Sequence, residues 1–155
     1  WAVIAETLLG NGDRAYQYYC ATNPVSRNDC IEVYECEPYV YSQNIISDEH
    51  PQAGLARNSW LTGAAAWHYL AATQYILGIR PELEGLRIDP CIPARWDGFK
   101  VKRKFRGKMV DIIIHNPEHV CKGIRKMCVD GKDMEQNPIP CEALHQNGFI
   151  EVWLG

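Results

Sequence analysis

The feature that most constrains the fold is a change, near residue 80, in how the apolar residues are spaced. Before it, apolar residues recur at helical intervals, in residues 1–19 and again from about Trp60 to Leu77. After it, four segments alternate apolar and polar residues as half-buried strands do: 99–107, 109–116, 123–132 and 148–155. The pattern therefore predicts helices followed by a β-sheet module, with Asp130-Gly131 as a hairpin turn.

The helical part is expected to begin with two helices joined at residues 10–12, with Asp13 near the start of the second helix. An irregular stretch of about forty residues follows, from 21 to 59. Loops of this length are uncommon in compact domains and usually serve a function. A third helix comes next, and Gly78 and Pro81 are expected to end it.

Charge and hydropathy argue against two classes of partner. The chain of 155 residues has a net charge of −3, and its only basic run, Lys100–Lys108, alternates as the solvent-exposed face of a strand does. We therefore expect no nucleic-acid partner. No stretch reaches the roughly 18 unbroken apolar residues that a membrane helix needs, so we also expect no membrane partner.

Two further features indicate the setting of the chain, its cysteines and its first residue. The seven cysteines form no CxxC pair and no zinc-like Cys/His grouping. We interpret them as mostly reduced, buried thiols of an intracellular protein, and we expect a cytoplasmic location. The chain opens on Trp1, already inside a helical pattern, which we interpret as the C-terminal end of a longer protein.

The third helix is apolar on every side, yet its start is polar, with Asn58, Ser59, Thr62 and Gly63 close together. A helix without a polar, solvent-exposed face is expected to pack inside a larger helical assembly. Its polar start has two readings. In one, Ser59 caps the helix and Thr62 hydrogen-bonds within the first turn. In the other, free N–H groups, the two hydroxyls and the close approach allowed by Gly63 hold an anion such as phosphate.

Several charged residues of the irregular stretch resemble site residues. His50 follows Asp48 and Glu49, but three consecutive residues share no face of a regular element, so a loop role is expected. Glu37 is paired with no second group and is expected to be a structural carboxylate instead of a catalytic acid. Arg57 is expected to form an ion pair with a residue such as Asp48 or Glu49. Three aromatic residues either line a sugar site or fill the core, and both readings stay open: Tyr39, Tyr41 and Trp60.

Three segments carry a family resemblance that covers nearly the whole chain. They read EPYVYSQNI, DEHPQAGLARNSWLTGAAAW and ATQYILGIRPELEGLRIDPCIPARWDGFKVKRKFRG. This run resembles the C-terminal part of the inverting disaccharide phosphorylases of glycoside hydrolase family 94. Within that family it is most similar to cellobiose phosphorylase, and the block from GLRIDPCIP to FRG is the specific part.

The fold that the resemblance implies is an α+β fragment, the end of an (α/α)6 helical barrel followed by a C-terminal β-sandwich module. Residues 1–80 would supply the last helices and the active-site loop of the barrel, and residues 81–155 would form the sandwich. The family's catalytic aspartate and a phosphate-binding arginine would lie before Trp1. Trp1 would itself be the last residue of a motif that carries a phosphate-binding histidine. The chain alone is therefore expected to be inactive.

The activity that the resemblance implies is cleavage of cellobiose, or a related β-glucoside, by inorganic phosphate to give α-glucose 1-phosphate and glucose with inversion. Phosphate takes the place of the water and base of an inverting hydrolase. The family's phosphate-binding Thr-Gly pair falls on Thr62 and Gly63, and a sugar-site glutamine falls on Gln43. The family implies no metal, no organic cofactor and a homodimer. The alternatives are a relative acting on cellodextrin, laminaribiose or chitobiose, and a noncatalytic carbohydrate-binding or structural β-module.

Overall fold

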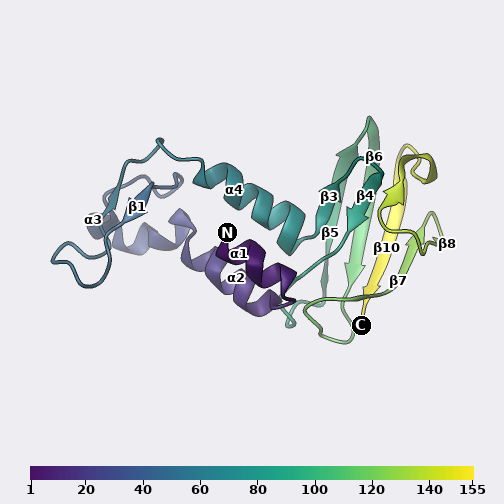
Figure 1. The fold of residues 1–155 in the computed structure, drawn as a ribbon, viewed down its shortest axis with the longest axis horizontal. Helices are drawn as coiled ribbons and strands as arrows, with labels where there is room; N and C mark the ends of the chain where they lie inside the picture. The colour runs from purple at the N-terminus through teal and green to yellow at the C-terminus, as the bar shows by residue number, and fades with distance from the viewer.

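The computed structural model describes residues 1–155, with helices in the first half of the chain and sheets in the second (Figure 1). α1 (Ala2–Leu8) and α2 (Gly12–Ala21) lie side by side as a helical hairpin, as the sequence predicts. The start of α2 packs closely on the chain near Ile92, because a Cβ atom at Gly12 would lie 2.1 Å from the carbonyl oxygen of Ile92. Only glycine permits this approach.

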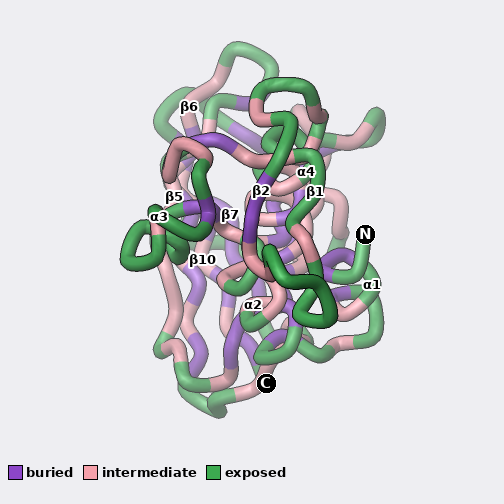
Figure 2. Tube along the Cα trace, turned by 90° about the vertical axis from the view of Figure 1, so that its left-hand side faces the viewer, coloured by how far each residue is buried: buried purple, intermediate pink, exposed green.

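The stretch after α2 contains more regular structure than the sequence indicates. A 3₁₀ helix, η1 (Pro24–Cys30), leads into the short α3 (Ile31–Tyr34), and β1 (Asn44–Ile45) pairs antiparallel with β2 (Ala56–Arg57). The prediction of an irregular stretch over residues 21–59 is therefore wrong in part. This segment lies at the far end of the molecule from the sheets (Figure 1), and much of it is exposed (Figure 2).

The third main helix starts later than predicted. α4 spans Ala64–Leu70 and continues as a π-helix, η2 (Ala71–Ile76). A start at Trp60 is excluded because Asn58 and Trp60 have φ angles of 57° and 68°, outside the helical region, and Gly63 is instead the N-cap. The sequence predicts that this helix packs on every side, but within this chain it does not. Large apolar side chains in or next to α1 and α4 are exposed: Trp1, Leu8, Leu9, Trp67 and Tyr69.

Two sheets make up the rest of the chain, and helix gives way to strand between residues 76 and 79, as predicted. The smaller sheet has the strand order β3-β4-β9, and the larger has the order β5-β6-β10-β7-β8. β10 runs parallel to β6 and antiparallel to β7. The strands are β3 (Ile79–Pro81), β4 (Gly85–Ile88), β5 (Gly98–Phe105), β6 (Lys108–His115), β7 (Ile124–Val129), β8 (Lys132–Asp133), β9 (Ile139–Pro140) and β10 (Gly148–Leu154), and a 3₁₀ helix, η3 (Cys141–Ala143), follows β9.

The four predicted strands and the predicted turn are confirmed. The alternating segments correspond to β5, β6, β7 and β10. Asp130 and Gly131 join β7 to β8 with φ angles of 48° and 78°, which fits a tight hairpin turn with two left-handed residues. The basic run also alternates as predicted, because Lys102 and Lys104 are exposed whereas Phe105 is buried.

The two sheets and the helices contribute side chains to one apolar core. Helices and sheets occupy separate parts of the chain, so its α+β character is confirmed. Ile150, Val152 and Leu154 of β10 are fully buried in the core. The same cluster holds buried side chains of β6 and of the smaller sheet: Val110, Ile112, Leu86, Ile88 and Ile139. Burial of each such side chain contributes about 1.5–3 kcal/mol. Ala15 of α2 and Ile76 of η2 belong to this cluster as well, so it anchors the helices on the sheets.

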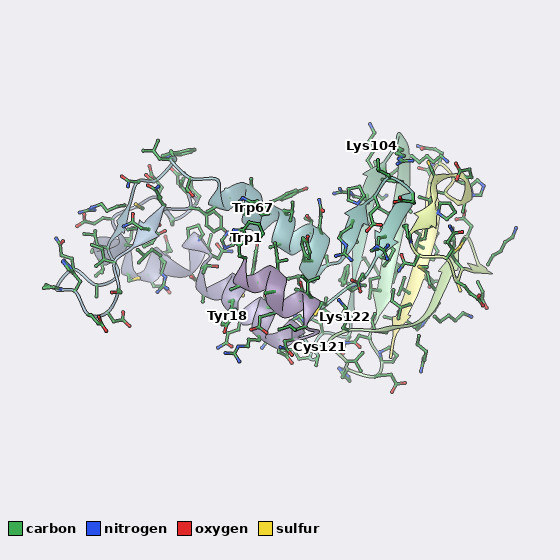
Figure 3. All side chains as sticks on the ribbon, in the orientation of Figure 1. Trp1, Tyr18, Trp67, Lys104, Cys121 and Lys122 are labelled. Atoms are coloured by element: carbon green, nitrogen blue, oxygen red, sulfur yellow. The ribbon has the colours of Figure 1, made fainter.

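A polar cluster fixes the end of α1 to the sheets. Lys122 Nζ donates to the carbonyl oxygen of Thr7 at 3.2 Å and to Asp89 Oδ2 at 3.3 Å. Arg80 donates to the same Asp89 oxygen at 2.9 Å. Figure 3 shows Lys122 and Cys121 at this junction between the helices and the larger sheet. One carboxylate therefore joins two cations from different segments.

The cysteines agree with only half of the prediction. All seven are free thiols, but only Cys91 and Cys128 are buried, and Cys30 is exposed. The prediction of mostly buried thiols is therefore wrong. Burial raises the pKa of the Cys91 thiol to about 11.

None of the helices has the length and apolar character that crossing a membrane requires.

Candidate functional site

Thr62 and Gly63 form the turn that precedes α4, and the Thr62 oxygen is used within that turn. Thr62 Oγ1 accepts a hydrogen bond from the N–H of Ala64 at 3.1 Å. Of the reading in which both residues act locally, the part for Thr62 is confirmed and the cap by Ser59 is wrong, because the Ser59 side chain makes no capping hydrogen bond to α4. The Thr62 hydroxyl hydrogen stays available to an outside acceptor, since the oxygen acts here as an acceptor. The N–H groups of Gly63 and Ala65 also make no hydrogen bond within the chain.

A cavity of about 330 Å³ opens beside this turn. Trp1 and Trp67 face each other at the cavity, with ring centroids 4.6 Å apart and planes tilted by 41° (Figure 3). The residue that the resemblance assigns to the end of the phosphate-histidine motif, Trp1, thus lies at the same cavity as the Thr-Gly pair. The full lining is Trp1, Val3, Thr62, Gly63, Ala64, Trp67, His68 and Ala71.

Gln43 lies at a second cavity, of about 240 Å³. Its backbone N–H donates to the carbonyl oxygen of Arg57 at 3.1 Å, and its side-chain oxygen accepts from Asn58 Nδ2 at 3.0 Å. The amide is thereby oriented, while its NH₂ group keeps two donors for a ligand. The lining of this cavity is Thr22, Tyr34, Tyr41, Ser42, Gln43, Asn44, Ile45, Ala64 and His68.

Two residues, Ala64 and His68, line both cavities. They form a wall with the Thr62–Gly63 turn on one side and Gln43 on the other. The arrangement suits two ligands that must meet, an anion at the hydrogen-bond donors of the turn and a neutral polyol at the amide. Sequence reasoning missed His68, and the only local signal is an imidazole inside an otherwise apolar helix.

None of the three aromatic residues fills the core of this chain, and one of them, Tyr41, lines a candidate ligand cavity. Tyr41 is half-buried in the second cavity and stacks on His68, with ring centroids 4.3 Å apart and planes 26° apart. Burial raises the pKa of Tyr41 to about 12, so its hydroxyl stays protonated and can donate. Tyr39 and Trp60 are exposed, so they do not fill the core of this chain.

Comparison with known protein families places the chain. Residues 1–78 match the glycosyl hydrolase 94 superfamily, catalytic domain, which is half of the chain. This chain belongs to the glycosyl hydrolase 94 superfamily. Residues 79–120 match the glycosyl hydrolase family 65, C-terminal domain. The family resemblance found in the sequence is therefore confirmed.

Two curated relatives of this glycosyl hydrolase 94 chain are named as disaccharide phosphorylases. N,N'-diacetylchitobiose phosphorylase of Vibrio proteolyticus is 44% identical over 100% of this chain and 19% of its own length. Solabiose phosphorylase of Paenibacillus borealis is 32% identical over 89% of this chain and 18% of its own length. The chain thus spans about a fifth of the length of these relatives. Neither is named for cellobiose, so they do not support the predicted likeness to cellobiose phosphorylase.

One solved structure is a more distant neighbour of this glycosyl hydrolase 94 chain. A family GH92 alpha-mannosidase from Bacteroides thetaiotaomicron aligns over 99% of this chain and 17% of its own, with a TM-score of 0.43 and 12% identity. A likeness at that level does not establish a shared fold.

Glu37 has the contacts of a structural carboxylate in this glycosyl hydrolase 94 chain, as predicted. Its Oε1 accepts a hydrogen bond from the indole N–H of Trp60 at 3.1 Å. Its own backbone N–H, followed by the Trp60 indole, holds the pKa of Glu37 below its usual range. A general acid needs a raised pKa, so Glu37 is unsuited to that role.

Arg57 and His50 are also held by local contacts. Arg57 lies 3.4 Å from a carboxylate oxygen of Glu35, so the predicted pairing with Asp48 or Glu49 is wrong. The chain brings Glu35 closer because α3 ends there, in a left-handed residue that turns the backbone. His50 Nδ1 accepts from the N–H of Gln52 at 3.1 Å, which is the expected loop role. No group of three or more His, Cys, Asp or Glu side chains is arranged to hold a metal ion.

Proposed function

We propose that this chain is the C-terminal part of an inverting disaccharide phosphorylase. The observation that carries the proposal is the pair of adjoining cavities: the Thr62–Gly63 turn lines one, Gln43 lines the other, and His68 lies in the wall between them. Family membership and the printed names of the relatives support the same class of reaction.

Phosphate would bind at the turn before α4. The free hydroxyl hydrogen of Thr62 and the unpaired N–H groups of Gly63 and Ala65 are donors of the kind that hold a phosphate dianion. Phosphate is already a nucleophile at neutral pH, so the reaction requires no base to activate water. The donors hold it for attack on the anomeric carbon opposite the departing bond, which inverts the configuration and gives an α-sugar 1-phosphate.

The sugar at the nonreducing side would bind at Gln43. The Asn58 contact fixes the Gln43 oxygen and leaves its NH₂ group to donate to a sugar hydroxyl, and Tyr41 offers a protonated phenol in the same cavity. We propose that the catalytic acid and the remaining phosphate ligands, an arginine and a histidine, come from a segment before Trp1. The chain alone would then be inactive.

The substrate preference that we propose is N,N'-diacetylchitobiose, ahead of cellobiose. The support is the relative at 44% identity over 100% of this chain, whose printed name is that of a chitobiose phosphorylase. Cellobiose stays as the comparison substrate, together with solabiose. We further propose that residues 1–80 complete an (α/α)6 barrel, that residues 81–155 form a β-sandwich module, and that the full-length enzyme is a homodimer without metal or organic cofactor.

The test is phosphate-dependent cleavage by the full-length protein that contains this chain. Each disaccharide is incubated with and without inorganic phosphate, and the anomeric configuration of the sugar 1-phosphate is read by NMR. The proposal predicts an α-configured product that forms only with phosphate, and fastest from N,N'-diacetylchitobiose. A full-length protein that is inert with phosphate on every β-linked disaccharide, yet binds them, would favour the noncatalytic carbohydrate-binding module.

A further inference from the structure

The imidazole of His68 is held at both of its nitrogen atoms. Nδ1 lies 2.9 Å from the carbonyl oxygen of Ala64, one turn earlier in α4. A carbonyl oxygen only accepts, so Nδ1 carries a hydrogen in this contact. Nε2 lies 2.8 Å from Oγ1 of Thr22, the C-cap of α2. The ring is therefore tied to its own helix on one side and to a different helix on the other.

Thr22 is a firm anchor for that second contact. Its hydroxyl lies 2.8 Å from the carbonyl oxygen of Tyr18 and 3.2 Å from that of Tyr19, both in the last turn of α2. The hydroxyl has one hydrogen and donates to only one of these acceptors at a time, but the short distances on both sides limit how far the Thr22 oxygen can move. The position of the His68 ring is thus set by the end of α2, 46 residues away in the chain.

One face of the fixed ring supports the segment that carries Gln43. Tyr41 stacks on His68 at 4.3 Å, and Tyr41 is two residues before Gln43. Tyr19 adds a tilted contact to the ring at 5.9 Å. The ring also lines the cavity at Thr62 and Gly63, so His68, together with Ala64, borders both candidate ligand spaces.

We propose that His68 is a positioning residue that holds the Gln43 segment, through Tyr41, in register with the start of α4. It thereby sets the spacing between the sugar and the phosphate. This inference rests on the proposed phosphorylase function and deepens it. His68 need not touch either reacting group, because its effect passes through the Tyr41 stack. Displacements of about 1 Å in such a site lower rates by up to about a hundredfold.

The test changes Thr22, which lines the second cavity but is not one of the groups proposed to bind the sugar or the phosphate. In the full-length protein, Thr22→Val keeps the shape of the side chain and removes the hydroxyl, whereas Thr22→Ser keeps the hydroxyl. Steady-state kinetics with both substrates varied give kcat and the two KM values, and melting temperatures check the fold. We expect Thr22→Val to lower kcat/KM for the disaccharide about tenfold, with KM for phosphate within about twofold of wild type.

The matched variant separates positioning from loss of stability. Thr22→Ser is expected to restore wild-type kinetics, because the hydrogen bond to Nε2 is kept. His68→Phe keeps a ring for Tyr41 but loses both nitrogen contacts, and we expect the double variant His68→Phe/Thr22→Val to be no slower than His68→Phe alone. Additive losses would overturn the proposal.

Other outcomes also decide the question. An active wild type together with a Thr22→Val variant of unchanged kinetics overturns the role of His68 and leaves the phosphorylase function standing. Equal losses in Thr22→Val and Thr22→Ser, or a rise in KM for phosphate alone, overturn it as well. An inert wild type removes the proposed function, and the role of His68 with it.

Discussion

Trp1 and Trp67 face each other with ring centroids 4.6 Å apart at the cavity that Thr62 and Gly63 line. Both rings are exposed in this chain and shield the cavity only in part, but even partial exclusion of water strengthens the electrostatic contacts to an anion. Trp67→Ala in the full-length protein is therefore expected to lower kcat/KM about tenfold, and Trp67→Phe to stay within about threefold of wild type. Equal kinetics for Trp67→Ala and wild type would show that the ring pair is not needed.

Glu37 is expected to stay ionised throughout the working pH range, because its backbone N–H and the Trp60 indole lower its pKa. Glu37→Gln should keep kcat within about threefold and leave the alkaline limb of the pH–rate profile, which reports loss of the acid's proton, in place. The rate and the alkaline limb are both obtained by measuring kcat and kcat/KM against pH for wild type and for Glu37→Gln. A limb that disappears in Glu37→Gln would make Glu37 the acid after all.

Asp130, in the turn after β7, contacts His145 before β10 and Phe149 within β10. Its Oδ2 accepts from His145 Nδ1 at 2.7 Å, its Oδ1 accepts from the N–H of Phe149 at 2.7 Å, and these contacts hold the pKa of Asp130 below its usual range. A carboxyl whose pKa is lower when folded stabilises the protein above its unfolded pKa of about 3.9 and loses that contribution as the pH falls through the folded value.

Asp130→Asn should therefore lower the melting temperature near neutral pH and lose most of that effect near pH 2–3. Asparagine tolerates the left-handed backbone at this position, where φ is 48°, so the change reports the charge. Glu142→Gln is the control, because Glu142 is exposed and makes no hydrogen bond or ion pair. A destabilisation by Asp130→Asn that is the same at every pH would contradict the linkage.

Lys122 joins α1 to the sheets through Thr7 and Asp89. Lys122→Met keeps the length of the side chain but removes both hydrogen bonds and leaves the Thr7 carbonyl without this donor. We expect a loss of about 1.5–3 kcal/mol in the free energy of unfolding, measured by chemical denaturation. Lys132→Met is the matched control, since Lys132 is exposed and forms no ion pair, and it should change the stability little. Similar losses in both variants would show that the junction is unimportant.

The sequence predicted the larger sheet well because its signal is local. The buried side chains of β10, Ile150, Val152 and Leu154, alternate along one strand and can be recognised without knowing any partner. The two-residue β9 carries no such pattern and exists only because it pairs with β4, about fifty residues earlier in the chain. Short strands of this kind depend on tertiary pairing and cannot be recognised from the spacing of apolar residues in the sequence.

The candidate site was predictable in part, and mostly through the family resemblance. Spacing alone left Thr62 between a local role and an anion site, and the structure shows the local hydrogen bond with the hydroxyl hydrogen still free. The helix start was misplaced because the positive φ of Trp60 has no signal in its own side chain. His68 was missed because its partners, Thr22 and Tyr41, are distant in sequence.

The central claim is that the Thr62–Gly63 turn holds inorganic phosphate. The most direct measurement is KM for phosphate in the full-length protein with the disaccharide saturating, for wild type, Thr62→Ala and Thr62→Ser. Because a hydrogen bond to a charged group contributes about 1.5–3 kcal/mol, we predict at least about a tenfold rise in Thr62→Ala and a value near wild type in Thr62→Ser. An unchanged KM for phosphate in a folded, active Thr62→Ala protein would contradict the account.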